Sequence, residues 1–380
     1  MDNPGQTRHK VFFENLDGLR FLCFIAVFLY HSFHTDLVHI SDTAAYRFIK
    51  TGIFGNGNIG VNFFFVLSGF LITYLLIEEK KVTGQVHVRF FWVRRILRIW
   101  PLYYLCVAFG FLAFPLLKTA FGQVPDETAD PWYYVTFIGN FDHIRKGVPD
   151  ASNLAVLWSV AVEEQFYLVW PVVLAFVPVR RYWAVFLAII AGSLWYRACN
   201  TSYLEHEMHT LSCIGDMAVG AMGSWLVQQR PAVLHRLERL GKGSIALIYA
   251  AFLAIFFFRK ELLHWSLAIT VAERVIIAVV IVLIILEQNY ARNSFIKMAR
   301  FKWMGYLGRI SYGLYCLHFI GILIALRITA WLGLNQTLAQ VAVLETGLAL
   351  GVTIALAHFS YQYYEKPFLR LKDRFAFITK

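Results

Sequence analysis

Long apolar runs alternate with short polar stretches along almost the whole chain. A helix that crosses the hydrocarbon core of a bilayer needs about 20 predominantly apolar residues. By that criterion the pattern predicts ten membrane-spanning helices, near 17–35, 60–77, 100–117, 154–177, 182–198, 211–228, 244–258, 267–287, 306–331 and 338–360. The chain is therefore predicted to be an all-α, polytopic integral membrane protein.

The basic residues are distributed unevenly between the two sets of polar segments. One set, which includes both chain ends, contains 23 Lys and Arg residues, whereas the alternating set contains 7. Segments rich in Lys and Arg stay on the cytoplasmic side of a membrane. The pattern thus predicts that both termini are cytoplasmic.

Composition excludes a soluble enzyme of this size. The 380 residues are 58% hydrophobic and only 16% charged, against about 45–50% apolar and about 25% charged in an average soluble domain. The net charge of +11 is better explained by membrane orientation than by nucleic-acid binding, so we expect no nucleic-acid partner. The five cysteines lack the spacing of zinc ligands, and we expect no metal site.

The chain shows no linker and no internal repeat that would divide it. We expect a cytoplasmic N-terminal tail over 1–15 without a signal peptide, one membrane domain over 16–365 and a basic cytoplasmic tail over 366–380. A charged side chain at membrane depth costs at least ~2.5–3.5 kcal/mol and is a functional-site hypothesis by default. Three segments contain such side chains.

The first predicted span carries Asp17, Arg20 and His31. Arg20 and His31 are eleven residues apart, so in a helix they share one face with roughly 16 Å between their levels. Arg20 is expected near the cytoplasmic mouth and His31 deeper in the membrane. In the structural alternative, Arg20 pairs with Asp17 or reaches the headgroups, and His31 only bonds another helix.

The fourth predicted span has Glu163 and Glu164 near the middle of an apolar stretch. Adjacent positions of a helix face different directions, so at least one of them needs a buried partner or a proton. In the second span, Ser68 lacks a GxSxG motif and a nearby base, and we expect it only to pack between helices.

The approach to the third span is rich in arginine. Arg94 and Arg98 share a helix face, and Arg95 lies beside them. One interpretation is contact with solvent or anionic lipid. The other is a cradle for a phosphate-bearing ligand, because guanidinium groups bind phosphate through two hydrogen bonds.

These blocks, together with three others, resemble the acyltransferase-3 family of membrane-bound acyltransferases. The similarity extends from Asn15 to Lys372 and includes LDGLR with His31 eleven residues after Arg20, IGVNFFFVLSGFLITYLL, RRILRIWPLYY, LWSVAVEEQFYLVWP, LGRISYGLYCLH and YYEKPFLRLK. Some members append an extracytoplasmic SGNH-type domain. We expect this chain to be a stand-alone member without one.

The resemblance implies an activity. Family members take an acyl group, usually acetyl, from acyl-CoA on the cytoplasmic side and place it on a hydroxyl of a carbohydrate or another glycosylated or small-molecule acceptor. We therefore expect acyl-CoA as the donor, no bound cofactor, a carbohydrate acceptor in cell-surface polysaccharide, and a location in the bacterial inner membrane.

The resemblance also suggests roles for the residues above. Arg94, Arg95 and Arg98 would hold the phosphates of acyl-CoA, with Arg20 deeper in the same entrance. His31, whose ordinary pKa is about 6.5, would deprotonate the acceptor hydroxyl or carry the acyl group transiently. Glu163 would fix the His31 tautomer, and four further residues are supporting candidates: Glu164, Tyr167, Tyr312 and His318.

A transporter or flippase of a glycan or small molecule is the competing class, because ten spans with buried charges also suit transport. Inverted repeats would favour that class, and the sequence shows no internal symmetry. For His318, a simple hydrogen bond between helices is the structural alternative.

Overall fold

The structure is a computed structural model that describes residues 9–10 and 13–379. Ten long helices follow the apolar runs because such runs can satisfy their backbone polar groups in lipid only as helices. They are α1 (Glu14–Ser32), α4 (Ile59–Thr83), α5 (Val88–Ala108), α10 (Leu157–Phe176), α11 (Tyr182–Cys199), α13 (Thr210–Gln229), α15 (Lys242–Leu263), α16 (Leu267–Tyr290), α18 (Ser311–Leu332) and α19 (Thr346–Phe359).

Shorter elements connect or extend these helices. The short α-helices are α2 (Val38–Ser41), α3 (Ala44–Arg47), α6 (Phe114–Ala120), α7 (Pro131–Val135), α8 (Gly139–Lys146), α9 (Ser152–Ala155), α12 (Tyr203–Met208), α14 (Pro231–Glu238), α17 (Lys302–Arg309) and α20 (Lys366–Lys372). Four π-helical turns cover Phe48–Ile53, Phe109–Ala113, Gln340–Glu345 and Ser360–Glu365, and three 3₁₀ turns cover Val179–Arg181, Met298–Arg300 and Asp373–Phe375. Strands β1 (His9–Lys10) and β2 (Ile378–Thr379) form one parallel pair.

The helical segments confirm a multi-pass all-α membrane protein, but not the number of spans. Among the described residues, eight segments are long and apolar enough to cross a membrane, and the pair α14 and α15, bent by 93°, makes a ninth if counted as one span. The expected first span is helical as α1, yet Glu14, Asp17 and Arg20 lie in its first two turns. These charges lower the apolar character of α1, which is not among the eight candidate spans. Ten spans and cytoplasmic termini therefore stay predictions.

The boundaries of the third span differ from the prediction. We expected a helix over 100–117, whereas the helical segment runs without interruption from Val88 to Ala120. Apolar residues are interleaved with the arginines of this approach, which therefore continues as the first turns of α5. Arg94, Arg95 and Arg98 consequently lie on the same continuous helix as the predicted span, as their expected helix face required.

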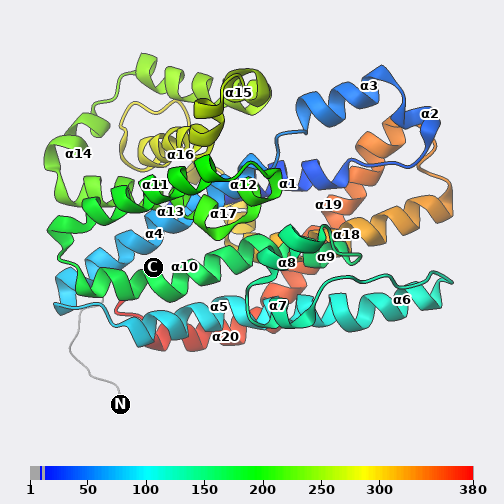
Figure 1. Cartoon of the computed structure of the whole chain (residues 1–380), viewed down its shortest axis with the longest axis horizontal. Helices are drawn as coiled ribbons and strands as arrows, with labels where there is room; N and C mark the ends of the chain where they lie inside the picture. Colours follow the sequence, from blue (N-terminus) through cyan, green and yellow to red (C-terminus); the bar gives the residue numbers. More distant parts are fainter. Residues whose placement is uncertain (1–8, 11–12, 380) are drawn as a thin grey trace.

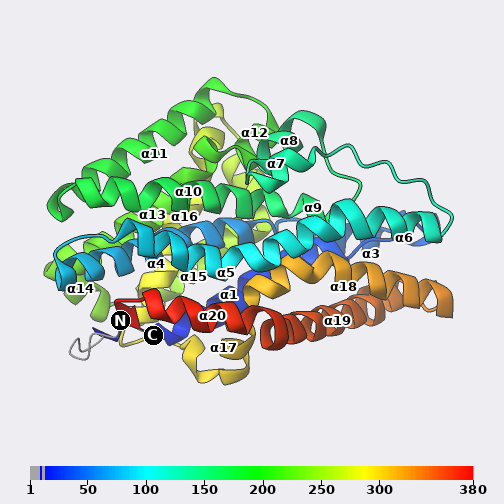
Figure 2. The same ribbon diagram turned by 90° about the horizontal axis from the view of Figure 1, so that it is seen from below.

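The long helices lie roughly along one common axis (Figures 1 and 2). The described chain ends meet at one end of this bundle, where His9 pairs with Ile378 and Lys10 with Thr379. Helices α3 and α6 lie at the opposite end in both views. The residues considered below are divided between these two ends.

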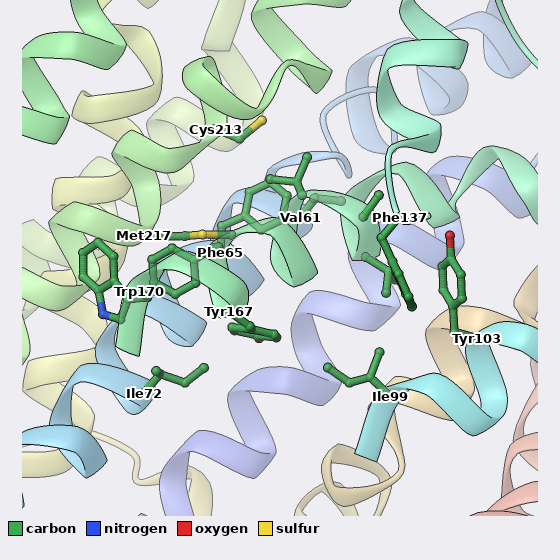
Figure 3. Packing of buried hydrophobic residues seen from close by; sticks show 14 of the residues in the cluster. Val61, Phe65, Ile72, Ile99, Tyr103, Phe137, Tyr167, Trp170, Cys213 and Met217 are labelled. Atoms are coloured by element: carbon green, nitrogen blue, oxygen red, sulfur yellow. The ribbon is translucent and has the colours of Figure 1, made fainter. Parts of the chain in front are cut away.

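Close contact between α4 and α13 forms the centre of the bundle. A Cβ atom on Gly69 would overlap the backbone of Met217, and one on Gly220 would overlap the backbone of Val66. Small residues let membrane helices approach to backbone contact. Around this pair lies a core of buried aromatic and aliphatic side chains, part of which is shown in Figure 3 with Phe65, Tyr167 and Trp170.

Candidate active site

His31 lies in the last turn of α1 and contacts a second histidine. Its Nδ1 is 3.0 Å from Nε2 of His318 on α18, and the two rings stack with centroids 5.1 Å apart. His318 is fully buried, and its Nδ1 is 2.6 Å from the carbonyl oxygen of Tyr315. The structure therefore joins one predicted catalytic residue to one predicted supporting residue.

These contacts determine which ring nitrogen of His31 and of His318 carries the proton when both rings are neutral. A carbonyl oxygen can only accept a hydrogen bond, so Nδ1 of His318 carries the proton that Tyr315 accepts. Nε2 of His318 is then the acceptor, and Nδ1–H of His31 donates to it. The remaining ring nitrogen of His31, Nε2, has an unshared electron pair and can act as a base.

His31 lines a cavity of about 290 Å³. The lining comes from the C-terminal end of α1, the π-helical turn after α5, the start of α9 and the middle of α18. Its walls are mostly Phe, Ile and Leu, with His31 and a few uncharged polar groups among them. We call this region the cavity end of the molecule.

Glu163 does not bond His31. Its carboxylate accepts hydrogen bonds from Ser68 of α4 at 2.8 Å and from Tyr167 of its own helix α10 at 3.1 Å. The hydroxyl oxygen of Tyr167 also lies 3.1 Å from Oγ of Ser68, so the three side chains form a closed ring of polar contacts in which the single hydroxyl proton of Tyr167 serves one of its two neighbours at a time. The expected role of Glu163 in fixing the tautomer of His31 therefore lacks a contact, and His318 occupies that position.

Ser68 is consequently more than a packing residue. The sequence offered no sign of this, because its partner Glu163 is 95 residues away and the usual serine-nucleophile motifs are absent. Glu164, the next residue on α10, turns to another neighbour and accepts a hydrogen bond from Trp100 at 2.8 Å. Tyr312 donates to the carbonyl of Ile99 at 2.8 Å and does not contact His31 through a hydrogen bond.

Two of the predicted donor-binding arginines are neutralised by the protein itself. Arg20 forms an ion pair of 2.6 Å with Asp17, as the structural alternative proposed. Arg94 pairs with Glu79 of α4 at 3.0 Å and donates to the carbonyl of Phe375 at 2.7 Å. Sequence analysis missed Glu79, because it lies just beyond the predicted span 60–77, in a polar segment where carboxylates are common.

The other two arginines keep their charges available. Within the described residues, neither Arg95 nor Arg98 forms a hydrogen bond or an ion pair, and the Arg95 guanidinium lies over the Tyr167 ring at 5.5 Å. Arg98 is close enough to Arg20, Arg95 and Lys372 for their charges to interact. These side chains form what we call the arginine end of the molecule.

A separate buried ionic network also escaped sequence analysis. Arg274 pairs with Asp216 at 2.6 Å, and Arg259 pairs with Glu207 at 2.9 Å and with Glu273 at 2.6 Å. The pairs connect α12, α13, α15 and α16. Because each arginine is matched by a carboxylate, the network is explained by the cohesion of these helices. Within the described residues it makes no hydrogen bond or ion pair with His31.

Comparison with known proteins confirms the family that the sequence motifs resemble. The family described as "acyltransferase domain" matches residues 13–360, and the chain belongs to this acyltransferase-3 family. Among similar proteins are a Staphylococcus aureus (strain COL) protein provisionally named an O-acetyltransferase, 24% identical over 96% of this chain, and the peptidoglycan O-acetyltransferase OatA of Listeria monocytogenes, 26% identical over 98% of it.

The similarity covers only part of these relatives. The chain spans 59% of the length of both proteins. A further relative, the O-acetyltransferase OatA of Staphylococcus aureus (strain NCTC 8325), is 31% identical over 43% of this chain and 25% of its own length. No solved structure matches the chain.

Proposed function

We propose that the protein is a membrane-embedded O-acetyltransferase that moves an acetyl group from acyl-CoA to a hydroxyl of a carbohydrate acceptor. The hydrogen-bonded pair of His31 and His318 at a cavity is the observation that supports this most. The pair leaves Nε2 of His31 as a basic nitrogen, and His31 belongs to the lining of a cavity with room for a small molecule. The names of the relatives support the acetyl group and the oxygen acceptor.

In the proposed reaction, Nε2 of His31 takes the proton of the acceptor hydroxyl while the hydroxyl oxygen attacks the thioester carbonyl carbon. The carbon–sulfur bond then breaks, and the leaving thiolate recovers the proton from the His31 imidazolium as free CoA. Nδ1–H of His31 donates to His318 throughout. This bond orients the ring and stabilises its cation, the work that a carboxylate performs in hydrolase triads.

The donor would bind at the arginine end. CoA carries several phosphate charges, and of the four predicted donor-binding arginines, Arg95 and Arg98 are the two that form no ion pair within the described residues. Lys372 of α20 would add a third charge there. Arg94 and Arg20, already paired with Glu79 and Asp17, would shape this mouth and contribute less to binding.

The acyl arm would then run from Arg98 toward His31, past the ring formed by Ser68, Glu163 and Tyr167. Ser68 and Glu163 keep part of their surface exposed although they lie between α4 and α10 in the interior. On this proposal donor and acceptor approach from opposite ends, and the orientation by charge would make the arginine end cytoplasmic. The membrane would be the bacterial inner membrane.

Purified protein in lipid nanodiscs tests the proposal. With acetyl-CoA and a mixture of neutral glycosides, we expect free CoA and an acetylated glycoside in equal amounts, followed by a thiol reagent and by mass spectrometry. The His31→Ala variant should produce neither. Equal rates for the variant and the parent protein would remove His31 from the chemistry, and a His31-linked acetyl group on the intact protein would replace the base mechanism with an acyl carrier.

A further inference from the structure

Two polar side chains that line the cavity beside His31 have buried atoms without a partner. Ser32 and Asn153 are each 3% exposed, and both belong to the cavity lining. Within the described residues, the Oγ atom of Ser32 and the Oδ1 atom of Asn153 make no hydrogen bond. A buried polar group without a partner costs about 1–3 kcal/mol, so these two atoms suit a ligand that would satisfy them.

The orientation of the Asn153 amide is fixed by its other contact. Its Nδ2 donates to the carbonyl oxygen of Cys106 at 2.9 Å. Because a carbonyl cannot donate, the nitrogen must lie on that side and Oδ1 must be the free atom. Asn153 therefore presents an acceptor, and a matching ligand must donate a hydrogen bond, as a hydroxyl does.

The rest of the lining restricts the ligand further. Phe109, Phe114 and Phe319 supply aromatic walls, and no Asp, Glu, Lys or Arg belongs to the lining. Besides His31, the lining contains one other titratable side chain, His34, whose Nε2 is already 3.1 Å from Oδ1 of Asp36. An anionic group buried there would therefore lack a free cationic partner. At about 290 Å³, the cavity is at the small end of ligand pockets, which hold about 300–1,000 Å³.

We infer that this cavity is the acceptor subsite, and that Ser32 and Asn153 bind a second hydroxyl of the ring whose first hydroxyl reacts at His31. The ligand class is a single neutral sugar ring or a cyclic polyol. The aromatic walls would receive the apolar C–H face of that ring, and the rest of a glycan would extend out of the cavity mouth. The inference rests on the proposed function of His31.

The decisive experiment removes the second hydroxyl from the ligand and its partner from the protein. The probes are methyl β-D-glucopyranoside and its monodeoxy derivatives, with acetyl-CoA as donor, and the proteins are the parent, Ser32→Ala and Asn153→Ala. In the parent, one monodeoxy derivative should lose about tenfold or more in kcat/KM. In Asn153→Ala the glucoside should fall to the level of that derivative, while KM for acetyl-CoA stays unchanged.

Ser193→Ala is the matched control. Ser193 is equally buried, but it bonds the carbonyl of Ser212 at 2.9 Å and does not line the cavity. It should retain the preference for the glucoside over its deoxy derivative. If Ser32→Ala and Asn153→Ala also retain this preference in full, the subsite assignment is wrong.

Binding without turnover separates this inference from the proposed function. Saturation-transfer NMR with methyl β-D-glucopyranoside should show ring contacts in the inactive His31→Ala protein and lose them in His31→Ala combined with Asn153→Ala. Asn153→Leu, which has a similar shape but no acceptor oxygen, serves as a second variant if Asn153→Ala unfolds early. Binding without any acetyl transfer would refute the proposed function and keep the subsite, whereas no binding in any protein would refute the subsite.

Discussion

The regions at the two ends of α1 differ in the polar side chains that they contain. At the arginine end, Arg95 and Arg98 form no ion pair within the described residues, and Lys372, which pairs with Asp373 at 3.5 Å, lies close to them. At the cavity end, His31 faces apolar walls and uncharged polar groups. On our proposals, these two ends would bind two chemically different ligands, a charged donor at one end and a neutral acceptor at the other.

The middle of the bundle differs from both ends. There Ser68, Glu163 and Tyr167 satisfy one another in a ring of hydrogen bonds. A buried polar group that is fully satisfied stabilises a particular packing, so this ring fixes α4 against α10. The polar groups in the middle bond one another and stabilise the fold. By contrast, we propose that the polar groups at the two ends bind ligands.

The largest effect is expected at the cavity end, from His31→Ala. Loss of a general base reduces the rate by about 10²–10⁴-fold, so kcat for acetyl transfer should fall by that order while KM for acetyl-CoA stays the same. Initial rates over a range of donor concentrations measure both constants. A raised donor KM with unchanged kcat would place His31 in donor binding and erase the division between the two ends.

Variants of His318 should have the next largest effect. His318→Phe removes the acceptor for His31 Nδ1–H, and a misplaced catalytic group costs about 10²-fold in rate. His318→Gln offers a carbonyl oxygen as a replacement acceptor and should recover part of the loss. The pH dependence of kcat/KM is the critical measurement: identical profiles for the parent, Phe and Gln proteins would mean that His318 only supports packing.

Arg98→Ala should act on the donor alone. Loss of a hydrogen bond to a charged phosphate costs about 1.5–3 kcal/mol, so KM for acetyl-CoA should rise about tenfold or more with kcat almost unchanged. Arg94→Ala is the control from the same helix: it leaves Glu79 without its partner and should lower the temperature of unfolding more than it raises the donor KM. The reverse result would restore Arg94 to the donor site.

The smallest effect should come from salt. Raising ionic strength from 0.1 M to 1 M shortens the screening distance from about 10 Å to about 3 Å. The KM for acetyl-CoA should rise a few-fold, because its phosphates meet a partly exposed arginine cluster. The KM for a neutral glycoside should not change. Equal salt dependence for donor and acceptor would contradict the assignment of charge to one end only.

The sequence was informative where the signal is local. Runs of apolar residues predicted helices that the structure contains, and the unusual depth of His31, Glu163 and the arginines marked them for attention. The count of ten spans stays a prediction, because Glu14, Asp17 and Arg20 make α1 less apolar than the eight candidate spans among the described residues. The third predicted span, 100–117, lies inside one helical segment from Val88 to Ala120, and the arginines before it share that helix, as their expected helix face required.

Partners of the buried groups could not be read in the same way. We expected Glu163 beside His31, but a helix position specifies only a direction, and the neighbour in that direction depends on how helices are arranged. Arg95 and Arg94 illustrate this: they are adjacent in sequence, yet one lies over the ring of Tyr167 and the other pairs with Glu79.

The sequence by itself determined that this chain is an all-α membrane protein of the acyltransferase-3 family, because apolar run length and ordered motif blocks are properties of the chain read in one dimension. Only the tertiary structure decided that His31 is paired with His318, 287 residues away, and that Ser68 and Tyr167 hold Glu163. Such pairs form because the interior has no water to satisfy polar groups. Each must therefore find its partner on whichever helix packing brings near.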